Sequence, residues 1–223
     1  LILDHVKLLF SIFEKKNYPI RLVGGCIRDS LINREIKDID TATSIEPHEV
    51  LNLLKYNKIE YEDFAIQYGS IVAYPLNKKV QITTLREDIN QLGRHTNVIY
   101  TQDWKKDSAR RDFTINAMYL GNDNKLSDYY DGQSDLKEKR IKFIGEIEDR
   151  IKEDYLRIYR YFRFLALFYL PKISLSDQKI VEKYIHDSLL VLTNDVIRKE
   201  ILKMFNMPYP LNCFFKSHQN HEK

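Results

Sequence analysis

The sequence predicts an α+β fold, in which a mixed sheet with helices is followed by an all-helical segment. Over roughly the first 140 residues, short apolar stretches and amphipathic segments alternate between turn residues. From residue 147 the patterning becomes long and helical, and it is dense in Arg, Tyr and Phe. We therefore expect a head at residues 1–145, a helical neck at 146–205 and a divergent or disordered tail at 206–223.

The composition of the 223 residues indicates a soluble globular protein with room for a sizeable core. The net charge of +3 permits a nucleic-acid partner without requiring one. No apolar run reaches the ~18 residues of a membrane span, and the N-terminus lacks the features of a signal peptide. With only two cysteines, we expect a reducing, cytoplasmic location and no membrane association. The sequence does not set the oligomeric state, and because the chain begins without methionine we expect a few residues to precede it.

The first elements follow from apolar spacing and from proline. Apolar side chains recur at helical spacing from Leu3 to Phe13, and Pro19 ends that helix. Pro47 suits the first turn of a further helix. In order, the expected elements are a helix at 3–17, a strand at 20–23, a helical turn at 26–32, a strand at 36–42 and a helix that runs to Lys55.

Turn residues divide the rest of the chain. Two apolar strands flank a turn at 75–77, and a polar stretch that contains Gly93 predicts a loop. Pro171 ends the long helical stretch that begins at Ile147. The expected elements are strands at 70–74 and 79–85, a loop at 86–97, a helix at 108–118, a β element at 119–120, turns at 123–124 and 128–132, and helices at 147–168, 176–187 and 193–205.

The first functional motif joins two glycines to two aspartates. Gly24 and Gly25 follow an apolar strand, where glycine lets the backbone approach a ligand closely and a helix start attracts phosphate. On the next expected strand, Asp38 and Asp40 point to the same face because strand side chains alternate. Two like charges there repel unless a cation lies between them, and magnesium prefers oxygen ligands. The motif predicts a site for metal-bound triphosphate, and the alternative is a turn followed by a solvated strand end.

The stretch LVGGCIRD, continued by KDID, resembles the signature of the nucleotidyltransferase superfamily with a polymerase-β-like palm. Its form, LVGGCIRDSLINREIKDIDTAT, is similar to that of class II tRNA nucleotidyltransferases (CCA-adding enzymes) and their bacterial poly(A) polymerase relatives. The resemblance implies that Asp38 and Asp40 bind catalytic Mg²⁺. It also implies that Gly25 and Arg28 contact the incoming nucleotide.

A second block, RRDFTINA, places Arg110 and Arg111 at the start of the expected helix at 108–118. Two positive charges there are unfavourable, because the helix dipole favours anions at that end. This indicates that an anion, such as a phosphate, balances them, and the alternative is a solvated basic pair. The block resembles the RRDFTxNA motif of the family, which implies that Arg111 and Asp112 contact the nucleotide.

A third block, EDYLRIYRYFR, lies in the expected neck. On one helix, Glu153 and Asp154 would share a face with Arg157 and could pair with it. Alone, this pattern favours a surface ion pair worth under ~1 kcal/mol. The block also resembles the EDxxR motif of the family, which implies that Asp154 and Arg157 hydrogen-bond the base edge of the incoming nucleotide. The resemblance further assigns Arg160 and Arg163 to nucleotide binding.

Two features discriminate within the family. The element Gly93-Arg94-His95 is similar to the end of the flexible loop of CCA-adding enzymes, and it favours full CCA addition. Gln81 stands where the family usually has a Glu, so we expect weaker metal binding if that acid holds the metal or its hydration shell. The resemblance covers about residues 20–205, and the family's helical body and tail have no counterpart after them.

The resemblance implies a template-independent RNA nucleotidyltransferase. It would add C, C and A to the tRNA 3′ end from CTP and ATP, with Mg²⁺ as cofactor, and release pyrophosphate. Two alternatives stay open. One is a poly(A)-, CC- or A-adding relative, and the other is a truncated nucleotide-binding remnant that needs a partner chain.

Overall fold

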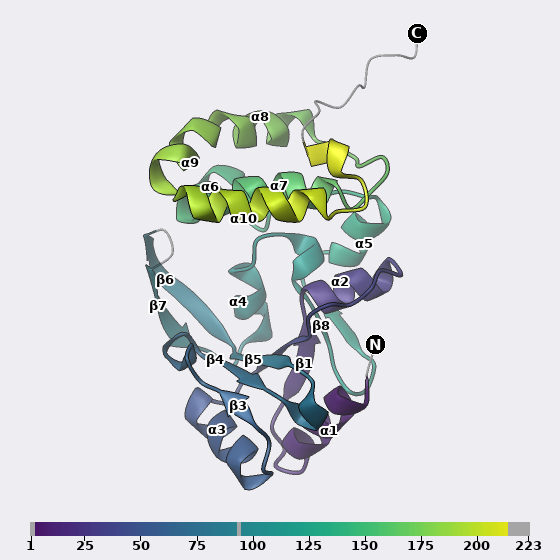
Figure 1. Ribbon diagram of the computed structural model, residues 1–223, viewed down its shortest axis with the longest axis vertical. Helices are drawn as coiled ribbons and strands as arrows, with labels where there is room; N and C mark the ends of the chain where they lie inside the picture. Colours follow the sequence, from purple (N-terminus) through teal and green to yellow (C-terminus); the bar gives the residue numbers. More distant parts are fainter. Residues whose placement is uncertain (1–2, 93–94, 214–223) are drawn as a thin grey trace. The chain divides into compact units, whose positions relative to one another are not determined.

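The computed structural model describes residues 3–92 and 95–213, and only the backbone of residues 89–92 and 95–97. The chain forms two compact units. Of the described residues, 3–90, 97–111 and 115–132 belong to the first unit, and 91–92, 95–96, 112–114 and 133–213 belong to the second. The sheet and the helices confirm the α+β class (Figure 1). The predicted head–neck boundary at residue 145 falls inside the second unit.

A seven-stranded mixed sheet forms the centre of the first unit (Figure 1). Its strand order is β3-β4-β5-β2-β1-β8-β9. β2 pairs with β5 in parallel, and every other neighbouring pair is antiparallel. β6 and β7 form a separate two-stranded sheet. The strands are β1 (Ile20–Val23), β2 (Asp40–Thr43), β3 (Tyr61–Glu62), β4 (Ser70–Ala73), β5 (Val80–Thr84), β6 (Arg86–Leu92), β7 (His95–Tyr100), β8 (Met118–Leu120) and β9 (Leu126–Asp128).

The helices of the first unit follow their apolar faces and caps. In α1 the buried positions recur at helical spacing, from Val6 to Phe13. A capping box of Glu46 and Glu49, with Pro47 in the first turn, begins α3. Asp103 caps α4 by accepting hydrogen bonds from two backbone amides. The bounds are α1 (Asp4–Glu14), α2 (Gly25–Leu31), α3 (Pro47–Tyr56) and α4 (Trp104–Ala109), with 3₁₀ turns at Ile66–Tyr68, Pro75–Asn77 and Thr114–Asn116.

Side chains from β1, β2, β8 and the residue after β5 pack together in the first unit. Val23, Ala42, Leu85 and Tyr119 form one buried cluster, and Trp104 packs against it. The Trp104 ring meets the Tyr119 ring edge-on, with 5.3 Å between centroids. This packing fixes β1 and β2, which carry the glycine turn and Asp40, against β8.

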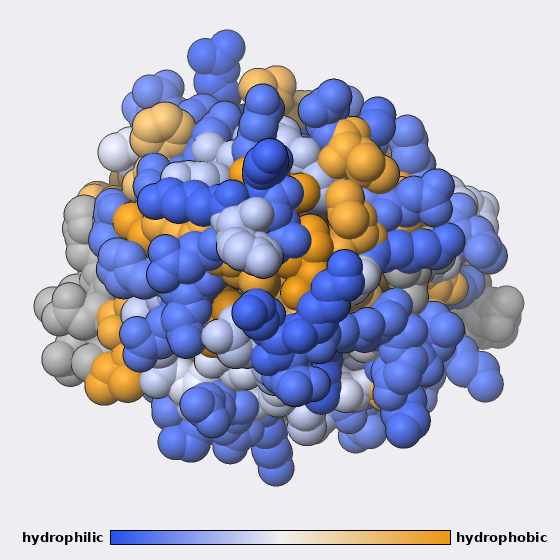
Figure 2. All heavy atoms as spheres, turned by 90° about the horizontal axis from the view of Figure 1, so that it is seen from below, coloured by the Kyte–Doolittle hydropathy of each residue, from blue (hydrophilic) through white to orange (hydrophobic). Residues whose placement is uncertain are grey.

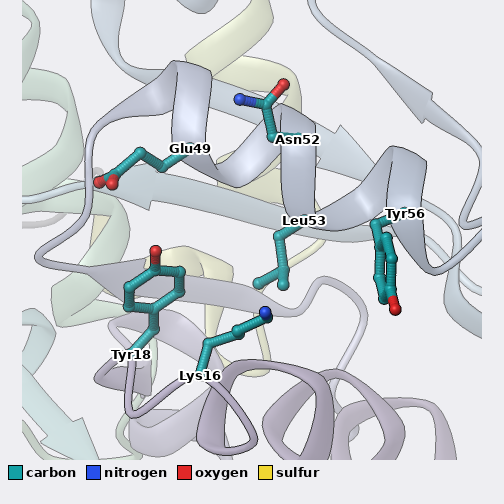
Figure 3. A pocket seen from close by; sticks show the side chains of 6 residues that line it. All are labelled: Lys16, Tyr18, Glu49, Asn52, Leu53 and Tyr56. Atoms are coloured by element: carbon teal, nitrogen blue, oxygen red, sulfur yellow. The ribbon is translucent and has the colours of Figure 1, made fainter.

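Viewed from below, the molecule shows apolar side chains gathered in a hollow with polar ones around them (Figure 2). A pocket of about 300 Å³ opens on the first unit beside α3 (Figure 3). It is lined by Lys16, Tyr18, Glu49, Asn52, Leu53 and Tyr56. None of the residues that the sequence assigned to a site lies in this lining.

The second unit is helical around an aromatic core. Phe113 lies between the rings of Phe143 and Phe164, with centroid distances of 4.7 and 5.5 Å. Tyr161 stacks on Phe143 at 5.7 Å. The helices are α5 (Gly132–Lys137), α6 (Ile147–Glu153), α7 (Leu156–Leu165), α8 (Leu175–Lys183), α9 (Ile185–Val191) and α10 (Asn194–Phe205), followed by a 3₁₀ turn at Pro210–Cys213. Within the described residues, none of the helices has the length and apolar character needed to cross a membrane.

Several predicted elements differ from the structure. The strand predicted at 36–42 begins at Asp40, although the Ile39 carbonyl already accepts a hydrogen bond from Gln81 N. The stretch predicted as a loop at 86–97 forms β6 and the beginning of β7 instead. Pairing between the two strands satisfies the backbone hydrogen bonds whether the side chains are polar or apolar. The structure adds β3, β9 and α5, which are too short to give a periodic signal.

The helix predicted at 108–118 is wrong. α4 ends at Ala109, and the chain then turns so that the buried Phe113 joins the core of the second unit. The Asp112 carboxylate accepts from Phe113 N, and Lys142 O accepts from Thr114 N. These bonds replace helical ones, so tertiary packing decides here over local propensity. The helices predicted at 147–168 and 176–187 are likewise each divided, at residues 154–155 and at Tyr184.

Replacing Phe113 by Ala should destabilise the second unit by about 3–4 kcal/mol, because it removes a fully buried ring and leaves a cavity. Urea unfolding followed by circular dichroism measures the change. The matched control is Phe205→Ala, since Phe205 is 61% exposed and should cost less than about 1 kcal/mol. Equal losses for the two variants would contradict the aromatic core described above.

Candidate functional site

The turn between β1 and α2 depends on Gly24. Its φ of +78° and ψ of −129° lie in a region that L-residues with a side chain avoid. Gly24 N donates to Met118 O on β8 at 3.3 Å. A Cβ atom on Gly24 would lie 3.6 Å from Arg111 Nη1. The glycine therefore holds a tight turn directly beside a guanidinium group.

Arg28 lies on α2 and its guanidinium is held from two sides. Nε and Nη2 donate to the two carboxylate oxygens of Asp29, each at 2.9 Å. Nη1 donates to Asn116 Oδ1 at 2.6 Å. The side chain is buried, and its Nη2 lies 3.5 Å from where a Cβ on Gly25 would be. Asp29 and Asn116 thus orient the predicted nucleotide-binding arginine next to the glycine turn.

Asp38 and Asp40 lie within electrostatic range of each other. Asp38 is exposed just before β2, Ile39 is buried, and Asp40 is half-buried as the first residue of β2. Burial raises the pKa of the Asp40 carboxyl, and the negative charge of Asp38 adds to the rise. The positive charge of Arg111 acts in the opposite direction. The structure therefore brings the two acids and Arg111 into electrostatic range of one another.

Gln81 is the parallel-register partner of Asp40 on β5. Its side chain is exposed, and Nε2 donates to Ser70 Oγ at 3.0 Å. The sequence singled out this position because the family usually has an acid there. The structure places a neutral amide beside Asp40, so the negative charge of the strand edge comes from Asp38 and Asp40.

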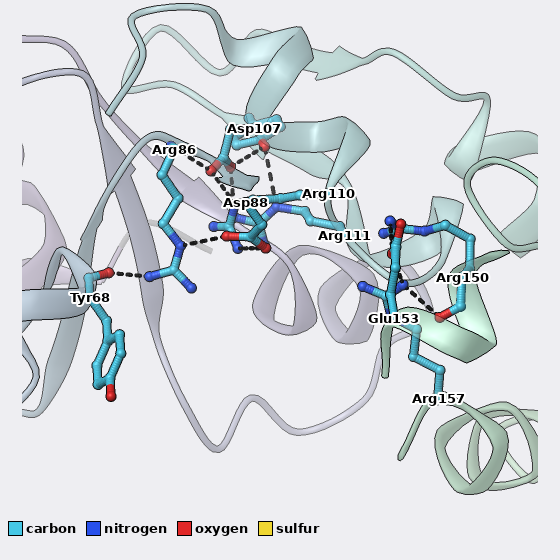
Figure 4. Close-up of polar contacts among 10 residues, drawn as sticks. Tyr68, Arg86, Asp88, Asp107, Arg110, Arg111, Arg150, Glu153 and Arg157 are labelled. Carbon is cyan, nitrogen blue, oxygen red and sulfur yellow. Dashed lines mark hydrogen bonds and ion pairs between the residues drawn. The ribbon is translucent and has the colours of Figure 1, made fainter. Parts of the chain in front are cut away.

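Asp107 on α4 joins three segments of the first unit, and the sequence analysis did not identify it. Its Oδ1 accepts from Arg86 N at 3.2 Å and from Arg110 Nε at 2.8 Å. Its Oδ2 accepts from Tyr119 Oη at 2.6 Å and from Arg111 Nη2 at 3.1 Å. Figure 4 shows Asp107 together with Arg86, Arg110 and Arg111. The signal that could have found Asp107 is its spacing, i,i+3 and i,i+4 from the two arginines.

This carboxylate is ionised although it is buried. Its side chain is 1% exposed. Burial alone would raise the pKa of Asp107, but Arg111 and Arg110 outweigh that effect and lower the pKa to about 2. Asp88 adds a second carboxylate, 3.3 Å from Arg86 Nε and 4.0 Å from Arg110 Nη1. Three guanidinium groups and two carboxylates therefore lie together in this cluster.

The predicted electrostatics of the RRDFTINA block need correction. Arg110 is the C-cap of α4, so the two arginines lie at a helix end, where the dipole favours cations. The anion that balances them is Asp107 of the protein. The predicted unfavourable helix start, and the need for a bound phosphate that was inferred from it, are therefore wrong.

In the second unit, Glu153 lies between two arginines (Figure 4). Arg157 Nη1 donates to Glu153 Oε2 at 2.6 Å and to Arg150 O at 2.8 Å, and Arg150 pairs with the same carboxylate. The predicted pair of Glu153 and Arg157 is present, but across the break between α6 and α7 rather than on one helix. Asp154 is half-buried in that break, and its Oδ1 accepts from Leu156 N at 3.0 Å.

The other predicted residues of the second unit also form ion pairs. Arg160 donates through Nε to Asp112 Oδ2 at 2.5 Å. Burial opposes the charged guanidinium, but Asp112 outweighs it and raises the pKa of Arg160. Arg163 Nε lies 3.2 Å from Oε2 of the buried Glu200. Asp154 also contributes to the raised pKa of Arg160, so these two groups lie within electrostatic range.

The structure thus assembles two sets of predicted residues. Within the first unit these are Gly25, Arg28, Asp38, Asp40 and Arg111, and within the second unit they are Asp112, Asp154, Arg157, Arg160 and Arg163. Gly93 and Arg94 of the predicted loop element lie outside the described residues. His95 begins β7, and its side chain is not among those described.

A model of the poly(A) polymerase head domain matches residues 20–142, more than half of the chain. The chain belongs to this family. The match includes the glycine turn, both aspartates and the RRDFTINA block. The predicted resemblance is confirmed.

This head-domain chain is similar to proteins that are named for CCA addition. CCA tRNA nucleotidyltransferase 1, mitochondrial, from Homo sapiens is 43% identical over 72% of this chain and 37% of its own length. The CCA-adding enzyme of Lactobacillus delbrueckii subsp. bulgaricus is 34% identical over 86% of this chain and 47% of its own length. The chain therefore spans about half or less of the length of these relatives.

Solved structures show the same fold. The crystal structure of the Bacillus stearothermophilus CCA-adding enzyme in complex with CTP superposes with a TM-score of 0.83 over 94% of this chain and 50% of that chain, at 24% identity. The Thermotoga maritima CCA-adding enzyme complexed with tRNA gives a TM-score of 0.72 over 93% of this chain and 48% of that one, at 26% identity. The predicted mixed sheet with a helical segment is confirmed as a nucleotidyltransferase-like fold.

Enzymes of nucleotidyltransferase families generally use a divalent metal ion. Among residues 3–92 and 95–213, no group of three or more His, Cys, Asp or Glu side chains could hold a metal. The oxygen donors of Asp38 and Asp40 fit a hard cation that keeps water and substrate oxygens in its remaining positions. Burial is the main cause of the raised pKa of Asp40, and the charge of Asp38 adds to it, so a cation between the two acids would favour the ionised form of Asp40.

The Asp107 carboxylate should make stability depend on acid pH. Its pKa is lowered in the folded chain to about 2 from an ordinary value of 3.8, so its stabilisation is complete above pH 5 and is lost as the pH falls toward 2. Between pH 5 and pH 3 the loss should be about 1 kcal/mol. Urea unfolding of the wild-type chain and of Asp107→Asn at both pH values measures it. The variant should lose less stability than the wild type over this interval, and equal losses would show that the carboxylate is not ionised by its partners.

Proposed function

We propose that this chain is the catalytic and nucleotide-selecting part of an RNA nucleotidyltransferase that adds CCA to the 3′ end of tRNA from CTP and ATP. One observation carries the proposal: the Asp38–Asp40 pair and Arg111 lie within electrostatic range, and Arg111 adjoins the glycine turn. Family membership and the names of the relatives support the choice of reaction. A solved relative with tRNA, and others with CTP and ATP, support the choice of substrates.

Asp38 and Asp40 are the residues that would hold Mg²⁺ as the cofactor. When bound, Mg²⁺ supplies charge stabilisation for the triphosphate and lowers the pKa of the attacking 3′-hydroxyl. Gln81, the register partner of Asp40, offers an amide where a third carboxylate would otherwise stand. The donor set therefore suits a cation that is bound together with the nucleotide rather than before it.

In the reaction, the tRNA 3′ oxygen attacks the α-phosphorus of the nucleotide, and the bond to the leaving pyrophosphate breaks. The chain contributes positioning and charge, and no covalent enzyme intermediate is needed. Arg111 places positive charge beside the glycine turn, where the triphosphate would lie. Arg28 and Gly25 contribute the second side of that turn, with Arg28 fixed by Asp29 and Asn116.

The second unit supplies the base selection. A carboxylate accepts a hydrogen bond from an exocyclic amine, which cytosine and adenine both have, and a guanidinium donates to ring nitrogen or carbonyl oxygen. Asp154 and Arg157 provide this pair, since Leu156 N holds the first and Glu153 the second. Uracil and guanine present the opposite pattern. We assign Asp112, Arg160 and Arg163 to further contacts with the nucleotide.

Two alternatives to this function remain: one adds a different product, and the other needs a partner chain for activity. The family model carries the name of poly(A) polymerases, so a poly(A)-, CC- or A-adding product is one alternative. The chain spans about half or less of its relatives, so dependence on a partner chain for tRNA binding is the other. Cytoplasmic location stays a prediction.

Radiolabelled CTP should be incorporated into tRNA that lacks its CCA end, and ATP should then complete the end. Sequencing of the product after incubation with CTP, ATP or both distinguishes CCA from poly(A), CC and A addition. Turnover by this chain alone excludes the need for a partner. If CTP binds but is incorporated only after another polypeptide is added, the chain is a nucleotide-binding part and the proposal of autonomous activity fails.

Asp40→Ala should abolish incorporation, by a factor of about 10³ or more, because it removes a ligand of the metal that activates the nucleophile. Binding of CTP, measured by calorimetry, should stay within a few-fold of the wild type. Asp63→Ala is the matched control, since Asp63 is an exposed acid of the same unit. Incorporation at the wild-type rate by Asp40→Ala would contradict the metal assignment.

Asp154→Ala should weaken the preference for CTP over UTP by about 10–100-fold, because the base-edge carboxylate no longer accepts the exocyclic amine. The ratio of kcat/KM for the two nucleotides measures this preference. Asp149→Ala, which changes an exposed acid of α6, should leave the ratio as it is. An unchanged ratio in Asp154→Ala would remove Asp154 from base selection.

A further inference from the structure

The Arg111 guanidinium has one side bound to the protein and another side beside the proposed triphosphate position. Its Nε donates to Tyr119 Oη at 3.2 Å and its Nη2 to Asp107 Oδ2 at 3.1 Å. Its Nη1 lies 3.6 Å from the position of a Cβ on Gly24. The Arg111 side chain is 17% exposed, whereas that of Asp107 is 1% exposed. A ligand at the glycine turn can therefore reach Arg111 but not the carboxylate behind it.

Tyr119 completes the arrangement around Arg111. Its hydroxyl donates to Asp107 Oδ2 at 2.6 Å and accepts from Arg111 Nε, so it connects the carboxylate to the guanidinium a second time. The ring is fully buried between Trp104 and the first-unit core. The Arg111 guanidinium also lies over this ring, 5.3 Å from its centroid. An arginine held at Nε, at Nη2 and by a ring has little rotational freedom left.

We propose that Asp107, together with Tyr119, is a positioning residue that fixes the Arg111 guanidinium for the triphosphate of the incoming nucleotide. The inference rests on the proposed function and adds to it two residues that do not touch the substrate. Without these contacts, the long Arg111 side chain would become ordered only when the nucleotide binds, and that ordering costs free energy. Because Asp107 and Tyr119 order it in advance, that cost is met during folding. In this arrangement, Arg111 Nη1 stays beside the glycine turn.

Three variants separate positioning from stability. Asp107→Asn keeps the shape but loses the charge, and Tyr119→Phe loses only the hydroxyl. Asp103→Ala is the matched control, because Asp103 caps the same helix without contacting the cluster. Calorimetry with inorganic tripolyphosphate in EDTA reports the phosphate site without metal, base or catalysis. Steady-state incorporation of CTP reports KM and kcat, and thermal unfolding reports stability.

We expect Asp107→Asn to raise the Kd for tripolyphosphate about tenfold or more and Tyr119→Phe about threefold, with matching increases in KM for CTP. kcat should fall less than threefold in Tyr119→Phe. Asp103→Ala should lower the melting temperature and leave the Kd unchanged. If Asp107→Asn and Tyr119→Phe lower the melting temperature but bind tripolyphosphate like the wild type, the two residues are structural only and the proposal fails.

The remaining outcomes are also decisive. If Asp107→Asn does not fold, Tyr119→Phe decides, since an unchanged Kd in that variant overturns the proposal. If the wild-type chain does not bind tripolyphosphate, Arg111 is not arranged for a triphosphate and the proposal fails. If the wild type binds tripolyphosphate with the expected dependence on Asp107 and yet incorporates no CTP, the positioning role stands and the proposed function fails.

Discussion

A buried carboxylate remains ionised only where cations and hydrogen-bond donors surround it, and Asp107 meets that condition. Four donors occupy its two oxygens, one from β6, one from β8 and two from the segment after α4. Each of these segments must be in place before its donors can offset the free-energy cost of burying the Asp107 charge. The same contact that stabilises this part of the first unit therefore also orients Arg111, so folding and the proposed nucleotide binding depend on one interaction.

The pairing of arginine with a protein carboxylate recurs at the predicted nucleotide contacts. Asp29 pairs with Arg28, and Glu153 pairs with Arg157. The buried Asp112 and Glu200 pair with Arg160 and Arg163, respectively. Such pairs fix planar donors in direction, which suits bidentate recognition of phosphate and of base edges. They also prevent the positive charges of these segments from repelling each other. The chain thus carries many arginines at its predicted site with a net charge of only +3.

The sequence was sufficient for the fold class and for the motifs, because both depend on local patterns. The glycine turn, the two aspartates and the pair of Glu153 and Arg157 follow from spacing within a few residues. The helix predicted at 108–118 failed because Phe113 is drawn into a core whose other rings come from residues 143–164. The role of Asp107 was missed for a similar reason. Its partners Arg86 and Tyr119 are brought to it by the sheet, and no short window of sequence contains all of them.

The pairing of strands in the seven-stranded sheet has a consequence for how the site forms. β2 lies beside β5 in parallel, and β1 lies beside β8, so neighbours in the sheet come from distant parts of the chain. Closing such long loops makes non-local pairing the slow part of folding. Asp40 starts β2, whereas Arg111 lies in the segment between α4 and β8, far along the chain from it. During synthesis from the N-terminus, the two aspartates emerge early, but their electrostatic partner Arg111 and the strand that carries Tyr119 emerge much later. The arrangement of the proposed site is thus a late product of folding.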